Sequence, residues 1–194
     1  MTYNPPLLLL DTNVWLDLFL PHRPNRRTVL DLLSAAETHE ASLAYPSCAI
    51  LDVYQKVRSD NKRWIRSSRE LTELDALAIK RMAWDYVNLM RRKATAVPVD
   101  TNDVALACSF RDTHDDLEDD LILAACQRAG ADYLVTTDAA LIAHAPVEAV
   151  TPARMLELLR SGSAKGAPTS HESPSTTDWL YRWLAQYGTS EGRS

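Results

Sequence analysis

Two aspartates stand where a strand-like run gives way to a turn or helix. Asp11 directly follows the apolar run Leu7–Leu10, and Asp138 follows the run Tyr133–Thr136. A third group of acids, Asp115–Asp120, opens a predicted helix. Ligands of open α/β sheets bind at the carboxyl ends of the strands, so we expect these acids to meet at one edge. Gathered carboxylates repel unless a hard cation such as Mg²⁺ neutralises them, so the sequence predicts a metal site.

Other chemistries have less support. The acids at Asp11 and Asp115–Asp120 could instead serve only as helix caps and first-turn acids. No hydroxyl or thiol nucleophile has a histidine base nearby, and the five histidines lack the spacing of a metal-binding helix face. The cysteines contain no C-x-x-C pair, so we expect small buried apolar side chains rather than disulfides or zinc ligands; they are Cys48, Cys108 and Cys126.

The elements that must position these acids alternate between short strands and helices. Strands are predicted at Leu7–Leu10, Ala41–Tyr45, Ala96–Val99, Tyr133–Thr136 and Val147–Val150. Helices are predicted after Leu10, from Pro46 onward with Asp52 inside, and over residues 67–92, 100–110, 117–129 and 152–160. Strands separated by helices indicate an α/β fold with a parallel sheet of about five strands.

The chain divides by composition into three parts. Residues 1–160 are predicted to form one compact domain. Residues 161–176 are rich in Ser, Thr, Gly and Pro and indicate a flexible linker. Residues 177–194 form a tail with a short amphipathic helix, whose apolar face includes Trp179 and Trp183. So short a helix is not stable alone in water, so we expect this face to bind something.

Charge is distributed unevenly along the chain. The net charge is -5. From Lys56 to Lys93 there are eleven basic and five acidic residues, a net charge of +6, so the rest of the chain carries -11. A basic segment beside an acidic remainder suits a metal-using enzyme that acts on a polyanion. No apolar stretch approaches the roughly 20 residues of a membrane helix, and we expect a cytoplasmic protein.

Five short motifs, in order, resemble the signatures of the PIN domain family. They are Leu9–Trp15, Ala49–Tyr54, Asp116–Ile122, Leu134–Asp138 and Val150–Pro152. The resemblance covers about residues 5–160 and implies a three-layer α/β/α domain. Within the family, the sequence looks most like the VapC-type toxins of prokaryotic toxin-antitoxin pairs. Those proteins are Mg²⁺- or Mn²⁺-dependent endoribonucleases.

The resemblance assigns roles by position. Asp11, Asp119 and Asp138 match the acids that bind metal, and Asp116 lies one helical turn from Asp119, close enough to share the ion. Asp52 stands where the family ordinarily has Glu, so its shorter side chain departs from the pattern. These expectations give a catalytic set of Asp11, Asp52, Asp119 and Asp138. The supporting polar residues are Asn13 and Thr136.

The implied activity is hydrolysis of RNA by a metal-bound water. A toxin of this kind implies a small antitoxin partner and a homodimer. Arg63 and Arg66 are predicted to contact RNA, and Trp64 could stack on a base, whereas we expect Trp84 to pack in the core. The alternatives are a catalytically weak PIN-like module that binds RNA or protein, and a structure-specific DNA nuclease.

Overall fold

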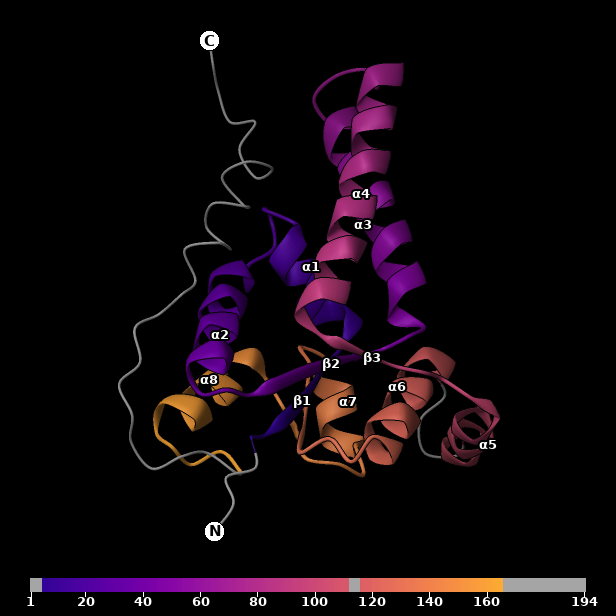
Figure 1. Cartoon of the computed structure of the whole chain (residues 1–194). Helices are drawn as coiled ribbons and strands as arrows, with labels where there is room; N and C mark the ends of the chain where they lie inside the picture. Colours follow the sequence, from indigo (N-terminus) through magenta and orange to yellow (C-terminus); the bar gives the residue numbers. More distant parts are fainter. Residues whose placement is uncertain (1–4, 112–115, 166–194) are drawn as a thin grey trace.

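The computed structural model describes residues 5–111 and 116–165, which contain a five-stranded parallel sheet (Figure 1). The strand order is β3-β2-β1-β4-β5, so the first strand is central. The strands are β1 (Leu7–Leu10), β2 (Ser42–Pro46), β3 (Thr95–Val97), β4 (Tyr133–Val135) and β5 (Ala149–Val150). All five predicted strands are present, within two residues at each end. The α/β class with a parallel sheet is therefore confirmed.

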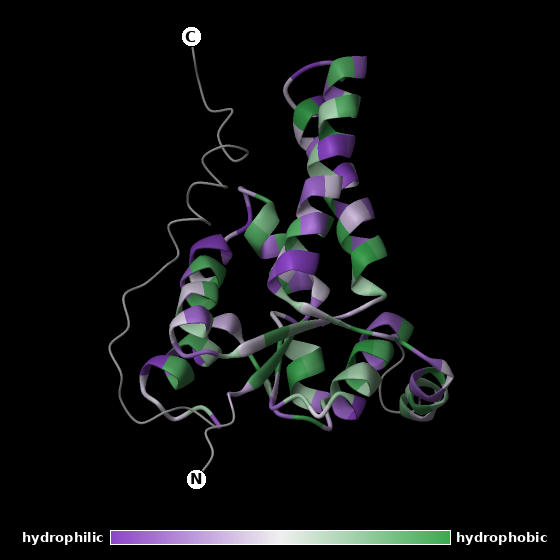
Figure 2. Ribbon diagram, in the orientation of Figure 1, coloured by the Kyte–Doolittle hydropathy of each residue, from purple (hydrophilic) through white to green (hydrophobic). Residues whose placement is uncertain are grey.

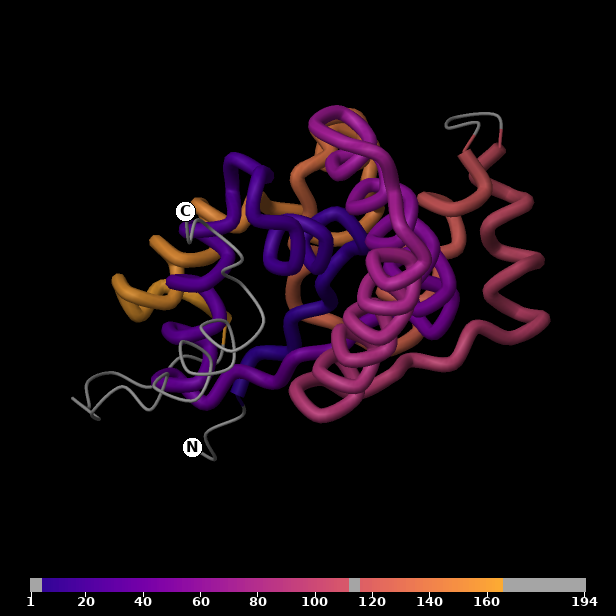
Figure 3. Tube along the Cα trace, turned by 90° about the horizontal axis from the view of Figure 1, so that it is seen from above, coloured from indigo at the N-terminus to yellow at the C-terminus, as the bar shows by residue number. Residues whose placement is uncertain are grey.

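Helices cover both faces of the sheet and make three layers (Figure 1). One face is packed by α1 (Thr12–Phe19), α2 (Arg26–Thr38), α3 (Ala49–Arg66), α4 (Glu73–Lys93) and α8 (Pro152–Arg160). The other face is covered by α6 (Leu117–Arg128) and α7 (Ala139–His144), with α5 (Thr101–Phe110) beside α6. Viewed from above, α2 and α8 lie at one end of the molecule and α5 at the other (Figure 3).

The side chains of β1 are divided between the two faces. Leu8 and Leu10 enter the core beneath α1 and α2, and Leu9 enters the core beneath α6. All three are fully buried, as expected for a strand with helices on both sides. In Figure 2 hydrophobic residues colour much of the central strands and alternate with hydrophilic ones along the helices around them.

The long helix predicted over residues 67–92 begins later than expected. α3 continues to Arg66, and α4 starts only at Glu73. The cause is a capping box, in which the Thr72 hydroxyl accepts from the Asp75 amide while the Asp75 carboxylate accepts from the Thr72 amide. Arg69 also forms an ion pair with Asp75 at 2.6 Å, which further stabilises the turn between α3 and α4. The two helices form a hairpin that projects away from the sheet (Figure 1).

Two helices were not predicted from the sequence. α2 buries Val29, Leu32 and Ala36 against the sheet and packs on α8. α7 has six residues and is capped by Asp138. By contrast, α8 begins with Thr151 as N-cap and Pro152 at its first position and ends at Arg160, as predicted.

The described chain stays packed against the domain beyond α8. Ala164 is buried in the core, the Lys165 amide donates to the Tyr133 hydroxyl at 3.0 Å, and Lys165 pairs with Glu148 at 2.8 Å. The first five residues of the predicted linker are therefore ordered on the domain. The rest of the linker and the predicted tail helix lie outside the described residues.

The cysteines do not behave as one group. Cys126 is buried as expected, but Cys48 is half-buried and Cys108 is exposed. The expectation of three buried cysteines is therefore wrong for two of them. Within residues 5–111 and 116–165, no helix is both long and apolar enough to span a membrane.

Candidate active site

The candidate site lies at the carboxyl ends of β1 and β4, which are neighbours in the sheet. Their register pairs Leu10 with Val135, and the Asp11 amide donates to the Val135 carbonyl at 3.0 Å. Asp11 and Thr136 therefore leave the sheet side by side, although 125 residues separate them in the chain. This edge is where an open α/β sheet binds its ligands.

The Asp11 carboxylate is held in a fixed orientation. Its side chain is only 1% exposed. Oδ2 accepts a 2.7 Å hydrogen bond from the Thr136 hydroxyl and a 3.4 Å contact from the Asn13 amide. Burial raises the pKa of Asp11 above its usual value, while the Thr136 hydroxyl, nearby backbone amides and the charge of Lys56 act to lower it. Both residues expected to support Asp11 thus contact it.

A second cluster faces the site from α3 and α6. Lys56 Nζ lies 3.4 Å from the Glu118 carboxylate, and Asp52 is close enough to hydrogen-bond to Glu118. Burial raises the pKa of Glu118, Lys56 lowers it, and Asp52 raises it further by repulsion. Neither Lys56 nor Glu118 was singled out from the sequence. The sequence signal for Lys56 is its spacing of four residues from Asp52, which places both side chains on one face of a helix.

Two of the remaining predicted ligands are the N-caps of helices. Asp116 is the N-cap of α6 and accepts from the Glu118 amide at 3.0 Å and the Asp119 amide at 3.3 Å. Asp138 is the N-cap of α7. Its own amide donates to the Thr136 hydroxyl at 3.0 Å, so it is tied to the residue that holds Asp11. Asp119 lies partly buried in the first turn of α6, whereas Asp115 lies outside the described residues.

The predicted RNA contacts lie on the outer half of α3. Arg63 is 81% exposed and lies 3.5 Å from Asp60, and Arg66 is exposed. Trp64 is 61% exposed. The expectation that Trp84 packs in the core is wrong, because it is 53% exposed and rests against Tyr54 across the hairpin, with ring centroids 5.4 Å apart.

The donor set matches a hard divalent cation in chemical type. Asp11 is a buried carboxylate whose pKa is raised by burial despite the hydrogen bonds that it accepts, and the neighbouring Thr12 hydroxyl is buried with no hydrogen-bond partner among the described residues. Oxygen ligands of this kind suit Mg²⁺ or Mn²⁺. In residues 5–111 and 116–165, however, no three acidic, histidine or cysteine side chains are gathered closely enough to hold a metal.

Comparison with known proteins identifies the family. The PIN domain family model matches residues 8–140, which is most of the chain. The protein therefore belongs to the PIN domain family, as the five motifs predicted.

A solved structure shares the fold. The chain superposes on one from the crystal structure of VapBC2 from Rickettsia felis bound to a DNA fragment from its promoter, with a TM-score of 0.52. The match covers 75% of this chain and 98% of that one, at 14% sequence identity. At this identity the likeness concerns the fold. No curated protein matches the sequence.

Proposed function

We propose that this protein is a metal-dependent endoribonuclease and the toxin of a toxin-antitoxin pair. The observation that carries the proposal is the buried Asp11 carboxylate, fixed by Thr136 and Asn13 at the carboxyl edge of the central strand of a PIN domain. A carboxylate buried at this edge is costly to the fold, which favours a functional role over a structural one.

Asp11, Asp119 and Asp138 are the proposed ligands of Mg²⁺ or Mn²⁺, with Asp116 adjacent. When bound, the ion supplies a water of lowered pKa and offsets charge on the phosphate. Thr136 orients Asp11 and, through the Asp138 amide, fixes the start of α7. Asp52 is the fourth proposed catalytic acid, and its shorter side chain reaches Glu118.

Lys56 offsets the negative charge of this edge. It pairs with Glu118 and lowers the pKa of Asp11, so it keeps both carboxyl groups closer to the ionised form that binds a cation. Beyond Lys56, the basic residues of α3 favour a polyanion, and RNA is the proposed substrate. Arg63 and Arg66 are its proposed phosphate contacts.

A small antitoxin, a homodimer and a cytoplasmic location complete the proposal. All three follow from the resemblance to VapC-type toxins, and the fold shared with a chain of the VapBC2 complex supports the antitoxin partner. Exposed apolar side chains on the α3–α4 hairpin offer area for a protein partner; they are Leu51, Leu74 and Leu77.

The second candidate function is a catalytically weak PIN-like module that binds RNA or protein. Two observations favour it: Asp52 is shorter than the Glu usual at its position, and the described carboxylates do not form a group of three. The third candidate is a structure-specific DNA nuclease, which would prefer structured DNA to single-stranded RNA.

Cleavage of labelled single-stranded RNA separates these functions. We expect wild-type protein to cleave in millimolar Mg²⁺ or Mn²⁺, to stop in EDTA, and to lose cleavage in Asp11→Asn. Asp31→Asn is the matched control, since Asp31 lies on α2 and pairs with Arg27 away from the site. A folded wild-type protein that binds RNA without cleaving it would favour the binding module, and preference for structured DNA would favour the DNA nuclease.

A further inference from the structure

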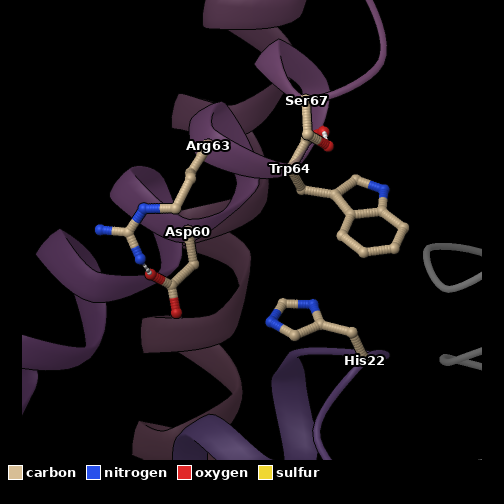
Figure 4. Close-up of a pocket in the computed structure, with 5 residues that line it drawn as sticks. All are labelled: His22, Asp60, Arg63, Trp64 and Ser67. Carbon is tan, nitrogen blue, oxygen red and sulfur yellow. Dashed lines mark hydrogen bonds and ion pairs between the residues drawn. The ribbon is translucent and has the colours of Figure 1, made fainter.

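A pocket of about 260 Å³ lies away from the candidate active site, between α3 and the loop that follows α1. Figure 4 shows the five residues that line it, which are His22, Asp60, Arg63, Trp64 and Ser67. Pockets that enclose a drug-sized ligand hold roughly 300–1,000 Å³, so this one suits a single planar ring system.

One side of the pocket is aromatic. The rings of His22 and Trp64 are nearly parallel, with an interplanar angle of 4° and centroids 5.5 Å apart. Trp64 nevertheless keeps 61% of its surface exposed. A folded protein gains little by exposing an indole, whereas single-stranded nucleic acids are bound by stacking bases on such rings. This side of the pocket therefore suits an unpaired base.

The other side of the pocket carries a carboxylate. In Figure 4 the pair of Asp60 and Arg63 stands opposite the two rings, and the two side chains lie 3.5 Å apart. A carboxylate accepts hydrogen bonds, and guanine is the base that presents two adjacent N–H donors on its Watson–Crick edge. Arg63 offsets the repulsion between Asp60 and the phosphates of a bound strand.

The pocket is placed to take a base a few nucleotides away from the cleaved bond. Arg63 follows Lys56 by seven residues on α3, which is close to two turns, so the two lie on one face of the helix about 10 Å apart. A stacked strand advances roughly 3.4 Å per nucleotide, so the pocket lies about three nucleotides from Lys56, whose charge acts on Asp11. From Lys56 to Arg69 there are six basic residues and one acidic residue, which favours a nucleic acid over an acidic peptide.

We infer that this pocket binds an unpaired guanine of the RNA substrate, stacked on Trp64 and read by Asp60. The inference rests on the proposed ribonuclease function, and it adds a recognition subsite that the acids at the sheet edge do not supply. His22 supports the indole from the loop after α1, and Arg63 keeps Asp60 in place.

The test uses the full chain and fluorescein-labelled twelve-nucleotide RNAs, one of uridines alone and one with a single central guanosine. Binding is measured by fluorescence anisotropy in EDTA, so that cleavage plays no part. We expect wild-type protein to bind the guanosine RNA at least about fivefold more tightly. Trp64→Ala should weaken binding of that RNA by about 5- to 100-fold, the range seen when a stacked base loses its aromatic partner.

Three further variants define the subsite. Trp64→Phe should retain most of the affinity, because a ring remains for stacking. Asp60→Asn should reduce the preference for guanosine with less effect on the uridine RNA. Trp84→Ala is the matched control, since Trp84 is a half-exposed tryptophan on α4 outside the pocket, and its binding should equal that of wild type.

The inference would be overturned if wild type bound the two RNAs equally. It would also be overturned if Trp64→Ala, with a normal melting temperature, bound RNA as wild type does. Either result would favour a protein partner at the pocket. Cleavage in Mg²⁺ is scored separately on the same RNAs. Absence of cleavage by wild type would refute the ribonuclease proposal whatever the binding result, so the two failures are distinguishable.

Discussion

The hydrogen bond from Thr136 to Asp11 gives a sharp test of how the site is built. Thr136→Val keeps the shape of the side chain and removes the hydroxyl. That hydroxyl donates to Asp11 Oδ2 at 2.7 Å and accepts from the Asp138 amide at 3.0 Å, and both Thr136 and Asp11 are buried. The variant leaves a buried carboxylate without its strongest donor and an amide without its acceptor.

The expected loss follows from these two contacts. A hydrogen bond to a charged group contributes about 1.5–3 kcal/mol, and an unsatisfied amide adds about 1 kcal/mol. We therefore expect the free energy of unfolding at pH 7 to fall by about 2.5–4 kcal/mol. For a chain of this size each kcal/mol lowers the melting temperature by roughly 2–4 °C, so the shift should be at least about 5 °C.

The pH dependence has a definite sign. Burial already raises the pKa of Asp11, and loss of the Thr136 donor raises it further. A raised carboxyl pKa means that the ionised form is the costly one in the folded protein. The deficit of Thr136→Val should therefore be largest at neutral pH and should shrink as the pH falls through the pKa of Asp11 in the folded state.

Urea unfolding of a double-mutant cycle measures this contact. The four proteins are wild type, Thr136→Val, Asp11→Asn and the double variant. We expect Asp11→Asn to be as stable as wild type or more stable, and the Thr136→Val loss to be at least about 1 kcal/mol smaller in its background. An equal loss in both backgrounds, or a loss below about 0.5 kcal/mol, would show that Thr136 does not act through the Asp11 carboxylate.

Metal binding, the role of Asp52 and the basic end of α3 can each be tested as well. Mg²⁺ at about 100 times its dissociation constant should stabilise wild type by about 2.7 kcal/mol and leave Asp11→Asn unaffected, as thermal melts would show. Asp52→Glu should maintain or increase the cleavage rate, whereas Asp52→Ala should lower it. If neither substitution changes the cleavage rate, Asp52 lies outside the catalytic set. Charge reversal at Arg63 and Arg66 should lower the slope of log affinity against log salt by about 1 for each lost phosphate contact, with single-turnover cleavage at saturation little changed.

The sequence was sufficient for elements whose signals are local. β1 is a run of leucines that ends at an acid, and α8 opens with Thr151 and Pro152, so their bounds were predicted closely. The start of α4 was missed because the apolar spacing continues through residues that the Thr72 capping box excludes from the helix. α2 does carry a local signal, because its buried residues Val29, Leu32 and Ala36 recur at helical spacing, so this helix was predictable from the sequence.

At the candidate site, too, some residues could be predicted from short sequence motifs and others depend on contacts between distant parts of the chain. The family motifs predicted that Asn13 and Thr136 support Asp11, and both residues contact its carboxylate. The contact between Lys56 and Glu118 could not be predicted in this way, because it joins α3 to α6 across 62 residues and depends on how the two helices approach each other. Trp84 was misplaced because helical spacing alone does not tell which face of a projecting hairpin is covered.

We propose that this PIN domain hydrolyses RNA with a metal-activated water at the edge that carries Asp11. The most direct measurement is mass spectrometry of the products formed in ¹⁸O-labelled water. We predict one solvent oxygen in the new terminal phosphate, no 2′,3′-cyclic phosphate, continued cleavage of a substrate with a 2′-deoxy sugar at the cleaved position, and no product with Asp11→Asn. A cyclic phosphate, or cleavage that survives EDTA and Asp11→Asn in the purified protein, would contradict hydrolysis by a metal-activated water at this edge.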